Sequence, residues 1–599
     1  MNDNAPTVRG APSATLQMPH PVLHSSPAHG PRHASTIRWL VALWILSTII
    51  RFGVSLTLHH PSIYLDELEY WSSAQSFHDS GKFLLFGEPL DMPAVLYSIS
   101  ISPAFAFVRA STTHVLAKLI SSLLMCSVVF PAYGLAREFL GRKDSVFVAI
   151  LSLLLCGGVY SATVMSENLF YPFFLASLWL SFRVLADGRL MDGVAAGSFW
   201  ILSFFTKPHI TVLMMAYIAC LGLWLLSSLK LPLQGQIRAV FIRSIPPLLF
   251  SIVALIRIFV RTDLSLYTRV LGTLYGQMAN SHTSLDWRWV TTSAIGLGLT
   301  TVFATGFVVL PVCLYSFITW RSTPVRERWF WVFTSLCYLA FVAIVSRHNA
   351  TNDSMIRIHE RYIFIVFPAL FVWFFSCYRR VSTQALTVLA ALIVGVSTFG
   401  FAVGITIWLN HPTWSDSPST TLFYSLYARL SSPALCMAVL TIFGLSSLVA
   451  IMFSKKSARA LVIVISMQLV LLNAGWYEFQ LHYIQPIEKH SRIASRLIQN
   501  TITPGDPVAF LSDNLDPQIV WSFGYWARNP VRVYGLSTPT PWSSEAGMAK
   551  FDEQRRLSFG AFVPGYVVAN IELPLPLLRD DPQNHVKIYK YPSLLQPAN

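Results

Sequence analysis

Five long apolar runs limit what this chain can fold into. Each is long enough to cross the hydrocarbon core of a membrane, which takes roughly 20 residues of helix. These runs are 39–58, 145–164, 209–229, 384–408 and 433–453. A backbone surrounded by lipid has to satisfy its own hydrogen bonds, so we expect them to be helices. Only 12% of the residues are charged, against about a quarter in a soluble domain, which also indicates a membrane protein.

Further apolar segments bring the number of predicted transmembrane helices to about 13. The expected spans are 37–58, 114–136, 145–164, 168–186, 192–206, 209–229, 244–260, 291–319, 329–345, 362–378, 384–408, 433–453 and 460–478. The predicted fold class is therefore an all-α polytopic membrane protein. Residues 94–109 are apolar but short and contain Pro103, so we expect a re-entrant or interfacial helix within a long first outer loop, 59–113.

Basic residues give the predicted orientation of this bundle. If the N-terminus is cytoplasmic, every loop on that side carries Lys or Arg, as the positive-inside rule requires. These residues are Arg137, Arg142, Lys143, Arg183, Arg189, Lys230, Arg238, Arg243, Arg321, Arg326, Arg328, Arg379, Arg380, Lys455, Lys456 and Arg459. Topology and anionic headgroups then explain the net charge of +14 better than nucleic-acid binding does.

The two ends of the chain differ from its middle. Residues 1–36 are polar and rich in Pro, His and Ser, which predicts a disordered cytoplasmic tail without a cleavable signal peptide. Residues 37–479 form the predicted transmembrane module. Since the number of spans is odd, residues 480–599 are expected outside, as a small α/β domain. Its predicted strands are 508–511, 531–534, 566–571 and 586–591, with a helix at 518–526.

An acidic cluster directly after the first span is the sharpest candidate for chemistry. Asp66, Glu67 and Tyr70 lie within five residues, and on a helix Asp66, Glu69 and Tyr70 would share one face. Ionisable groups at a membrane boundary are costly and are often functional. A carboxylate here can take a proton from a substrate hydroxyl or amine. The alternative is a solvated acidic loop.

Three more positions carry isolated charge at predicted outer turns. Glu167 is the only acid in the apolar stretch 145–186, although it could simply cap the next helix. Lys207 could hold a phosphate, or reach toward lipid headgroups. The loop 346–362 holds an excess of cations, with Arg347, His359 and Arg361 among them. An anionic ligand would explain this excess, because Arg forks suit phosphate oxygens, while headgroup contacts are the alternative.

In this order the motifs resemble the superfamily C (GT-C) glycosyltransferases, in the branch with protein O-mannosyltransferases and the lipid A aminoarabinose transferase. The resemblance spans about residues 37–380. Family members open their first outer loop with an Asp-Glu pair before a Tyr and carry an acid at the second outer loop. A Thr-Lys turn follows, and then an Arg-Tyr ahead of an apolar run with a Pro. The matching residues are Asp66, Glu67, Tyr70, Glu167, Thr206, Lys207, Arg361, Tyr362 and Pro368.

One motif departs from this pattern. The aminoarabinose enzyme carries Glu-Lys-Pro in its first loop, where this chain has Asp91-Met92-Pro93. The acid and the Pro are kept while the Lys is lost, so the phosphate has to be held from elsewhere, with Lys207 and Arg361 as the candidates.

The resemblance implies a glycosyltransferase that uses a polyprenyl-phosphate sugar on the extracytoplasmic side of the inner (plasma) membrane, with inversion at the anomeric carbon. It implies that Asp66 acts as general base or orients the acceptor nucleophile, while Glu67, Asp91 and Glu167 shape the sugar and acceptor site or hold a divalent cation. Lys207, Arg347 and Arg361 would stabilise the leaving phosphate, with His359 and Tyr362 beside them. No cofactor is certain from the sequence; a metal here would be Mg²⁺ or Mn²⁺, since hard cations prefer carboxylate oxygens.

Two other classes of protein stay open. A flippase of lipid-linked sugars would carry its ionisable groups near the middle of the membrane, whereas here the acids cluster at the boundary. A non-catalytic scaffold of an envelope-assembly complex would use the C-terminal domain for docking. For the enzyme, the partners are a polyprenyl-phosphate sugar donor and a glycan, lipid or protein acceptor in the envelope.

Overall fold

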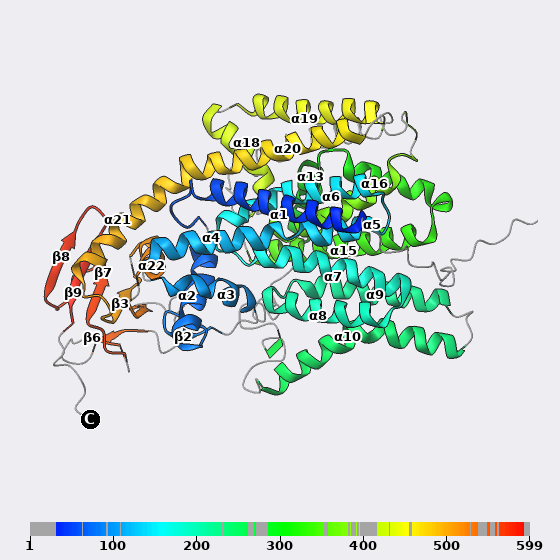
Figure 1. The fold of residues 1–599 in the computed structure, drawn as a ribbon. Helices are drawn as coiled ribbons and strands as arrows, with labels where there is room; N and C mark the ends of the chain where they lie inside the picture. Colours follow the sequence, from blue (N-terminus) through cyan, green and yellow to red (C-terminus); the bar gives the residue numbers. More distant parts are fainter. Residues whose placement is uncertain are drawn as a thin grey trace, which may run out of the picture.

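The computed structural model is a long helical bundle that carries a small mixed domain at one end (Figure 1). It describes residues 32–591 except 63, 91–93, 108, 229–232, 261–268, 271–285, 353–357, most of 381–415, 431, 455–457, 514, 528, 537–547, 552–556 and 560–561. Of the predicted tail, 1–36, residues 1–31 lie outside the described residues. The first helix begins at Arg32.

Apolar helices build the bundle. They are α1 (Arg32–Ser55), α4 (Ala110–Cys126), α5 (Val129–Arg137), α7 (Glu167–Asp187), α8 (Leu190–Thr206), α9 (Ile210–Ser228), α10 (Leu233–Val260), α15 (Val325–Asn352), α16 (Phe367–Cys377), α18 (Pro418–Leu430), α19 (Pro433–Ser454) and α20 (Ala458–Phe479). Among the described residues, eight helices are long and apolar enough to cross a membrane, or up to ten if two bent pairs each count as one span. The polytopic fold is thus confirmed, while the predicted span 384–408 lies almost entirely outside the described residues.

Two predicted spans are bent rather than straight. The span expected at 145–164 consists of α6 (Arg142–Leu154) and the 3₁₀ segment η2 (Cys156–Ala162), with a bend of 54° between them. Any side chain at Gly157 would collide with the ring of Phe364, so the close approach at this break requires glycine.

The sharper bend, of 109°, separates α13 (Trp287–Ala304) from the run of α14 (Val309–Ser316) and η3 (Phe317–Ser322). Gly306 and Phe307 have φ angles of +86° and +63° here, and two successive left-handed residues end a helix.

The first loop, 59–113, is folded rather than extended. It contains α2 (Tyr64–Ser80), the antiparallel pair β1 (Leu84–Leu85) and β2 (Glu88–Pro89), the short helix α3 (Leu96–Ile101) and η1 (Ser102–Ala106). The apolar stretch around Pro103 therefore forms short helical turns and not a full span, as its length and its proline predict.

The C-terminal domain continues directly from the membrane module. Helix α20 passes through the π turn η6 (Gln480–Ile484) into α21 (Gln485–Thr501), so residue 480, the expected domain boundary, lies inside one helical segment of 43 residues. The domain's five-stranded sheet has the order β4-β3-β7-β9-β8. The strands are β3 (Val508–Leu511), β4 (Val531–Tyr534), β7 (Tyr566–Ala569), β8 (Leu577–Asp581) and β9 (Val586–Lys590), with a small separate pair of β5 (Lys550–Phe551) and β6 (Leu557–Ser558).

This sheet is mixed, since β3 pairs in parallel with β4 and β7 while β9 is antiparallel to β7 and β8. Helix α22 (Pro517–Trp526) connects β3 to β4 and packs against the bundle. Trp71 of α2 stacks on Tyr525 of α22 with 4.2 Å between ring centroids, and Nδ1 of His114 on α4 lies 2.8 Å from the Tyr525 hydroxyl. These contacts fix the C-terminal domain beside α2, at what we call the domain end of the bundle.

Candidate active site

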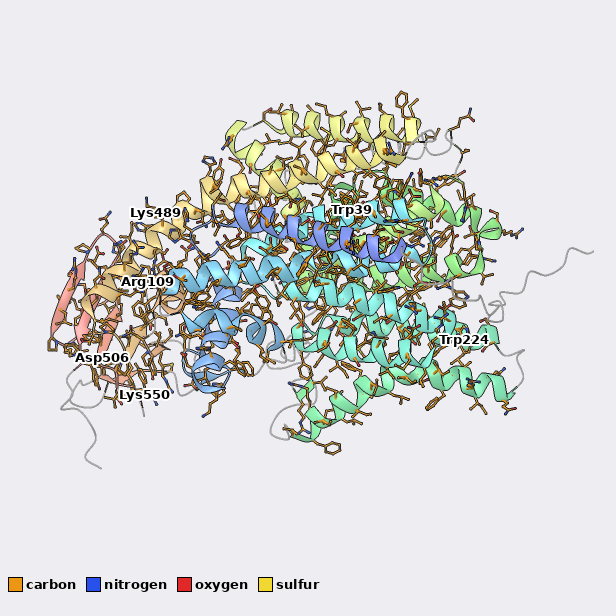
Figure 2. All side chains as sticks on the ribbon, viewed as in Figure 1. Trp39, Arg109, Trp224, Lys489, Asp506 and Lys550 are labelled. Atoms are coloured by element: carbon orange, nitrogen blue, oxygen red, sulfur yellow. The ribbon has the colours of Figure 1, made fainter. Side chains whose placement is uncertain are left out.

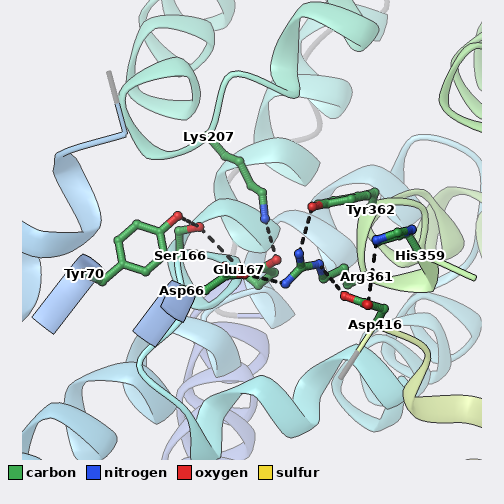
Figure 3. A network of polar contacts seen from close by, with 9 residues as sticks. All are labelled: Asp66, Tyr70, Ser166, Glu167, Lys207, His359, Arg361, Tyr362 and Asp416. Carbon is green, nitrogen blue, oxygen red and sulfur yellow. Dashed lines mark hydrogen bonds and ion pairs between the residues drawn. The ribbon is translucent and has the colours of Figure 1, made fainter. Parts of the chain in front are cut away.

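Four charged side chains from four distant segments meet at the domain end (Figure 3). Asp66 lies in the first turn of α2, Glu167 begins α7, Lys207 follows α8, and Arg361 lies in the short 3₁₀ helix η4 (Glu360–Tyr362). Nη1 of Arg361 donates to Oδ2 of Asp66 at 2.7 Å, and Nζ of Lys207 forms an ion pair with Oε1 of Glu167. The fold thus gathers the residues that the sequence separated.

Arg361 is the centre of this network. Its Nε lies 3.1 Å from Oδ1 of Asp416, its Nη2 donates to the Tyr362 hydroxyl at 3.0 Å, and its backbone N–H donates to the Asp416 carbonyl at 2.9 Å. Nε2 of His359 lies 3.7 Å from Oδ2 of Asp416. Asp416 therefore holds the guanidinium in place from the side opposite Asp66, as Figure 3 shows.

Aromatic rings form one wall of the site. The Tyr362 ring stacks on His209 at 4.5 Å and on His359 at 5.5 Å between centroids. Nζ of Lys207 and Cζ of Arg361 each lie 5.0 Å from the centre of the Tyr362 ring, within the range of a cation–π interaction. Tyr362 thus contacts both cations of the site at once.

Exposure separates Asp66 from the rest. Its side chain is 36% exposed, against 12% for Arg361, 6% for Lys207 and 1% for Glu167. A buried ion pair is not a reliable source of stability, because desolvation offsets the attraction. The Glu167–Lys207 pair therefore indicates a functional site in which Glu167 holds the Lys207 ammonium in place. Asp66 is the accessible carboxylate of this site.

Glu67, adjacent in sequence, points to the other side of α2. It is fully buried; its Oε1 accepts the N–H of Ser62 at 2.7 Å, and its Oε2 accepts the N–H of Val164 at 2.9 Å. The Tyr70 hydroxyl donates to Oγ of Ser166 at 2.8 Å. The Asp-Glu-Tyr motif thus attaches α2 to the turn that precedes α7, which brings Asp66 toward Glu167.

The other predicted site residues lie in different places. His359 and Tyr362 belong to the network, and Arg347 lies on an exposed part of α15, one residue before His348, whose ring is 5.5 Å from that of His359. Asp91 lies outside the described residues. In the described part of the chain, no group of three or more His, Cys, Asp or Glu could hold a metal ion.

Three members of this site were not singled out from the sequence. Asp416 stands directly before Ser417 and Pro418, a Ser-Pro pair that is typical of a helix start and could have placed Asp416 at a helix end. His209 stacks on Tyr362, and burial and the nearby Lys207 lower its pKa well below the ordinary value.

The third is Glu360, whose Oε2 accepts the N–H of Ser419 at 2.9 Å and the hydroxyls of Ser419 at 2.7 Å and Ser417 at 3.1 Å. Burial raises the pKa of Glu360 to about 7 against the opposing effect of these hydrogen bonds. Glu360 thus fixes η4, and with it Arg361, to the start of α18.

The apolar helices of the bundle make this a multi-pass membrane protein, and comparison with solved structures gives its fold as GT-C. Two solved structures share the fold: ArnT from Cupriavidus metallidurans in the apo state and the same protein bound to undecaprenyl phosphate. Both are 14% identical to this chain, with TM-scores of 0.53 and 0.55; each match covers 93% of this chain, and 98% and 99% of the other.

The sequence itself gives a second match. Residues 93–234 match the family model for dolichyl-phosphate-mannose-protein mannosyltransferase. No curated protein matches the chain. The predicted resemblance to GT-C glycosyltransferases is thereby confirmed, since the chain shares the fold of ArnT and residues 93–234 match the mannosyltransferase model.

Proposed function

We propose that this protein transfers a sugar from a polyprenyl-phosphate carrier to a glycan, lipid or protein acceptor on the extracytoplasmic face of the plasma membrane. The observation that carries the proposal is the convergence of Asp66, Glu167, Lys207 and Arg361 into one network of hydrogen bonds and ion pairs. The fold supports it, since a structure that shares the fold was solved with undecaprenyl phosphate bound.

The proposed reaction is a direct displacement. Asp66 takes the proton of the acceptor hydroxyl or amine as that atom attacks the anomeric carbon. The bond between the anomeric carbon and the phosphate oxygen breaks, and its electron pair stays on the polyprenyl phosphate. Arg361 and Lys207 stabilise the negative charge that develops there. A single displacement inverts the configuration at the anomeric carbon.

The contact between Asp66 and Arg361 gives this reaction an order. A phosphate oxygen that accepts a hydrogen bond from Nη1 of Arg361 takes the place of the Asp66 carboxylate. Asp66 then loses its partner and is free to accept the acceptor's proton. Donor binding thus releases Asp66 from Arg361 so that it can act as the base. Before a donor is bound, the contact with Arg361 would limit proton abstraction by Asp66.

The remaining residues support these two groups. Glu167 keeps Lys207 charged and in place, Asp416 orients Arg361, and Glu67 positions α2 through its backbone contacts. His359 and Tyr362 form the wall beside the phosphate. We keep for Asp91 a role in shaping the sugar or acceptor site and for Arg347 a role in holding phosphate, as the family resemblance implies.

Charge at the far end of the bundle supports the orientation. Arg326 pairs with Glu138 at 2.6 Å, Arg380 pairs with Glu327 at 2.7 Å, and Asp144 lies 3.0 Å from Arg379. Arg142 of a predicted inner loop donates to Ser35 at the start of α1, whereas His59, just after the end of α1, contacts Gln485 of α21 at the domain end. The positive-inside rule predicts that such a basic end is cytoplasmic. The site and the C-terminal domain then face outward.

The deciding experiment supplies the purified protein with a panel of polyprenyl-phosphate sugars and measures release of free polyprenyl phosphate by mass spectrometry. We expect release with at least one donor and acceptor extract, and loss of release in Asp66→Asn. A flippase would move the donor across vesicles without cleaving it, and a scaffold would do neither. Either result would overturn the proposal. Mass spectrometry of envelope glycolipids and glycoproteins from cells with and without the gene then identifies the product.

A further inference from the structure

A cavity with basic residues in its walls lies at the domain end, between the membrane helices and the C-terminal domain. Its volume is about 250 Å³, and its walls come from residues 56–60 after α1, the start of α4, helix α21 and Trp526 of α22. Figure 2 labels Lys489 on α21 and Arg109 just ahead of α4, which mark this region. None of the described residues that line the cavity belongs to the Asp66 network.

The charged side chains in the walls of this cavity are all basic. Its ionisable lining residues are His59, His60, His114, Lys118, Arg492 and Arg496, and none of the described lining residues carries a carboxylate. Lys118 is only 1% exposed and donates to the carbonyl oxygens of Ser55, at 3.1 Å, and Leu58. It also interacts electrostatically with Glu67, which does not line the cavity. Cations held together in a half-enclosed space are costly unless an anion joins them.

The walls of the cavity are held in a fixed geometry. Oε1 of Gln485 accepts the N–H groups of His59, at 2.9 Å, and His60, at 3.0 Å, and its Nε2 donates to the His60 carbonyl at 3.0 Å. The Arg492 guanidinium lies over the Trp526 ring at 4.2 Å. The backbone of residues 59–60 and the side chain of Arg492 are therefore ordered before any ligand arrives, which lowers the entropic cost of binding.

Several polar atoms in these walls have no hydrogen-bond partner. Nδ1 of His60, Nε2 of His114 and Nη1 of Arg492 are buried and unpartnered among the described residues. When Nδ1 of His114 accepts from the Tyr525 hydroxyl, Nε2 carries the proton and can only donate. Burial, and then the charge of Arg492, lowers the pKa of His60 to about 4, so that ring is neutral near pH 7. Unmet donors beside fixed cations suit an oxyanion.

We propose that this cavity binds a phosphate group, with Arg492 and Arg496 as its cations and the Nε2–H of His114 as a neutral donor. Leu56 and Val115 at its rim are 39% and 38% exposed, and they suit the hydrocarbon chain of a lipid. The phosphate can come from a lipid headgroup or from a free phosphate ester. This site does not rest on the proposed sugar transfer, because its residues are separate from the Asp66 network.

The test uses the full-length protein with Arg492→Gln/Arg496→Gln, and Lys489→Gln as the matched control. Lys489 is exposed on the same helix, so its change removes one positive charge outside the cavity, as Arg496→Gln alone removes one inside it. One arm titrates inorganic phosphate into protein in uncharged detergent and follows thermal stability. The other compares nanodiscs of phosphatidylcholine with and without phosphatidylglycerol and counts retained lipids by native mass spectrometry.

We expect wild type and Lys489→Gln to bind alike, and the double variant to bind about tenfold more weakly, which corresponds to about 1.4 kcal/mol. Binding in the lipid arm alone assigns a headgroup, and binding in the phosphate arm assigns a free anion; either supports the cavity. Because Arg492 contacts Trp526, the single variant Arg496→Gln, at an exposed position, checks the effect without disturbing packing. Wild-type protein that binds neither ligand, or a double variant that binds like Lys489→Gln, overturns the proposal.

Discussion

The guanidinium of Arg361 lies 2.7 Å from the carboxylate of Asp66, although 295 positions separate the two residues in the chain. The carboxylate is the most exposed member of the network, and the guanidinium is held from behind by Asp416 at 3.1 Å. An ion pair of this kind, with one fixed and one accessible partner, can be opened by a competing anion.

Asp66→Asn should reduce sugar transfer about 10²–10⁴-fold, because an amide cannot take the acceptor's proton. The measurement is the release of polyprenyl phosphate at saturating donor. Asp79→Asn is the matched control, since Asp79 is exposed near the end of the same helix α2. Equal activity in the two variants would show that Asp66 is not the base.

Glu167→Gln should lower the free energy of unfolding by about 3–5 kcal/mol, because it leaves the buried Lys207 charge without its partner. Unfolding in mixed detergent micelles measures this. The double change Glu167→Gln/Lys207→Met should recover much of the stability and yet stay inactive, since the phosphate has lost a cation. Glu88→Gln, which breaks the exposed pair with Arg532, should cost under about 1 kcal/mol.

Glu69→Gln should change how stability depends on pH. Burial, and then the charge of Asp66, raises the pKa of Glu69 from 4.5 to about 8. The folded state therefore binds a proton that the unfolded state has released, so this contribution is full below about pH 4.5 and is lost as the pH rises toward 8. The wild-type slope in this window, at most about 1.4 kcal/mol per pH unit, should flatten in the variant. Parallel curves would contradict the raised pKa.

Trp71→Ala should loosen the C-terminal domain. Trp71 is 1% exposed and stacks on Tyr525, so its removal should cost about 3–5 kcal/mol of packing. Limited proteolysis should then cut the segment between α21 and β3 faster, with little change in the membrane helices. Trp39→Ala, at a position that is 71% exposed on α1, serves as the control and should leave the cleavage rate unchanged.

Hydropathy predicted the apolar helices because burial in lipid is decided by local composition. The predicted segments from 37–58 to 362–378 fall on described helices, of which those at 192–206 and 362–378 are shorter than the candidate spans. The bends did not follow from hydropathy. The turn of 109° depends on Gly306 and Phe307, which have a left-handed backbone. That conformation does not change the mean hydropathy of the segment, so hydropathy could not predict the turn. Likewise, the change in composition near residue 480 predicts a domain boundary there, whereas the helix continues across this residue.

The site could be predicted only in part for a similar reason. Asp66, Glu167, Lys207 and Arg361 stood out because each is an ionisable residue at the end of an apolar run. The different directions of Asp66 and Glu67 depend on the phase of α2 against the rest of the fold. Asp416 could not be linked to Arg361, because that contact joins two loops whose meeting is decided by packing.

The unbroken helix from Arg459 to Thr501 also has a mechanical consequence. At 1.5 Å per residue its 43 residues span about 64 Å, with only one π turn along the way. A tilt of about 5° at its lipid-embedded end displaces the far end of a straight helix of this length by roughly 6 Å. The stack of Trp71 on Tyr525 ties the sheet that α21 carries to α2, so a change in the inclination of α20 would have to move α2 together with the outer domain.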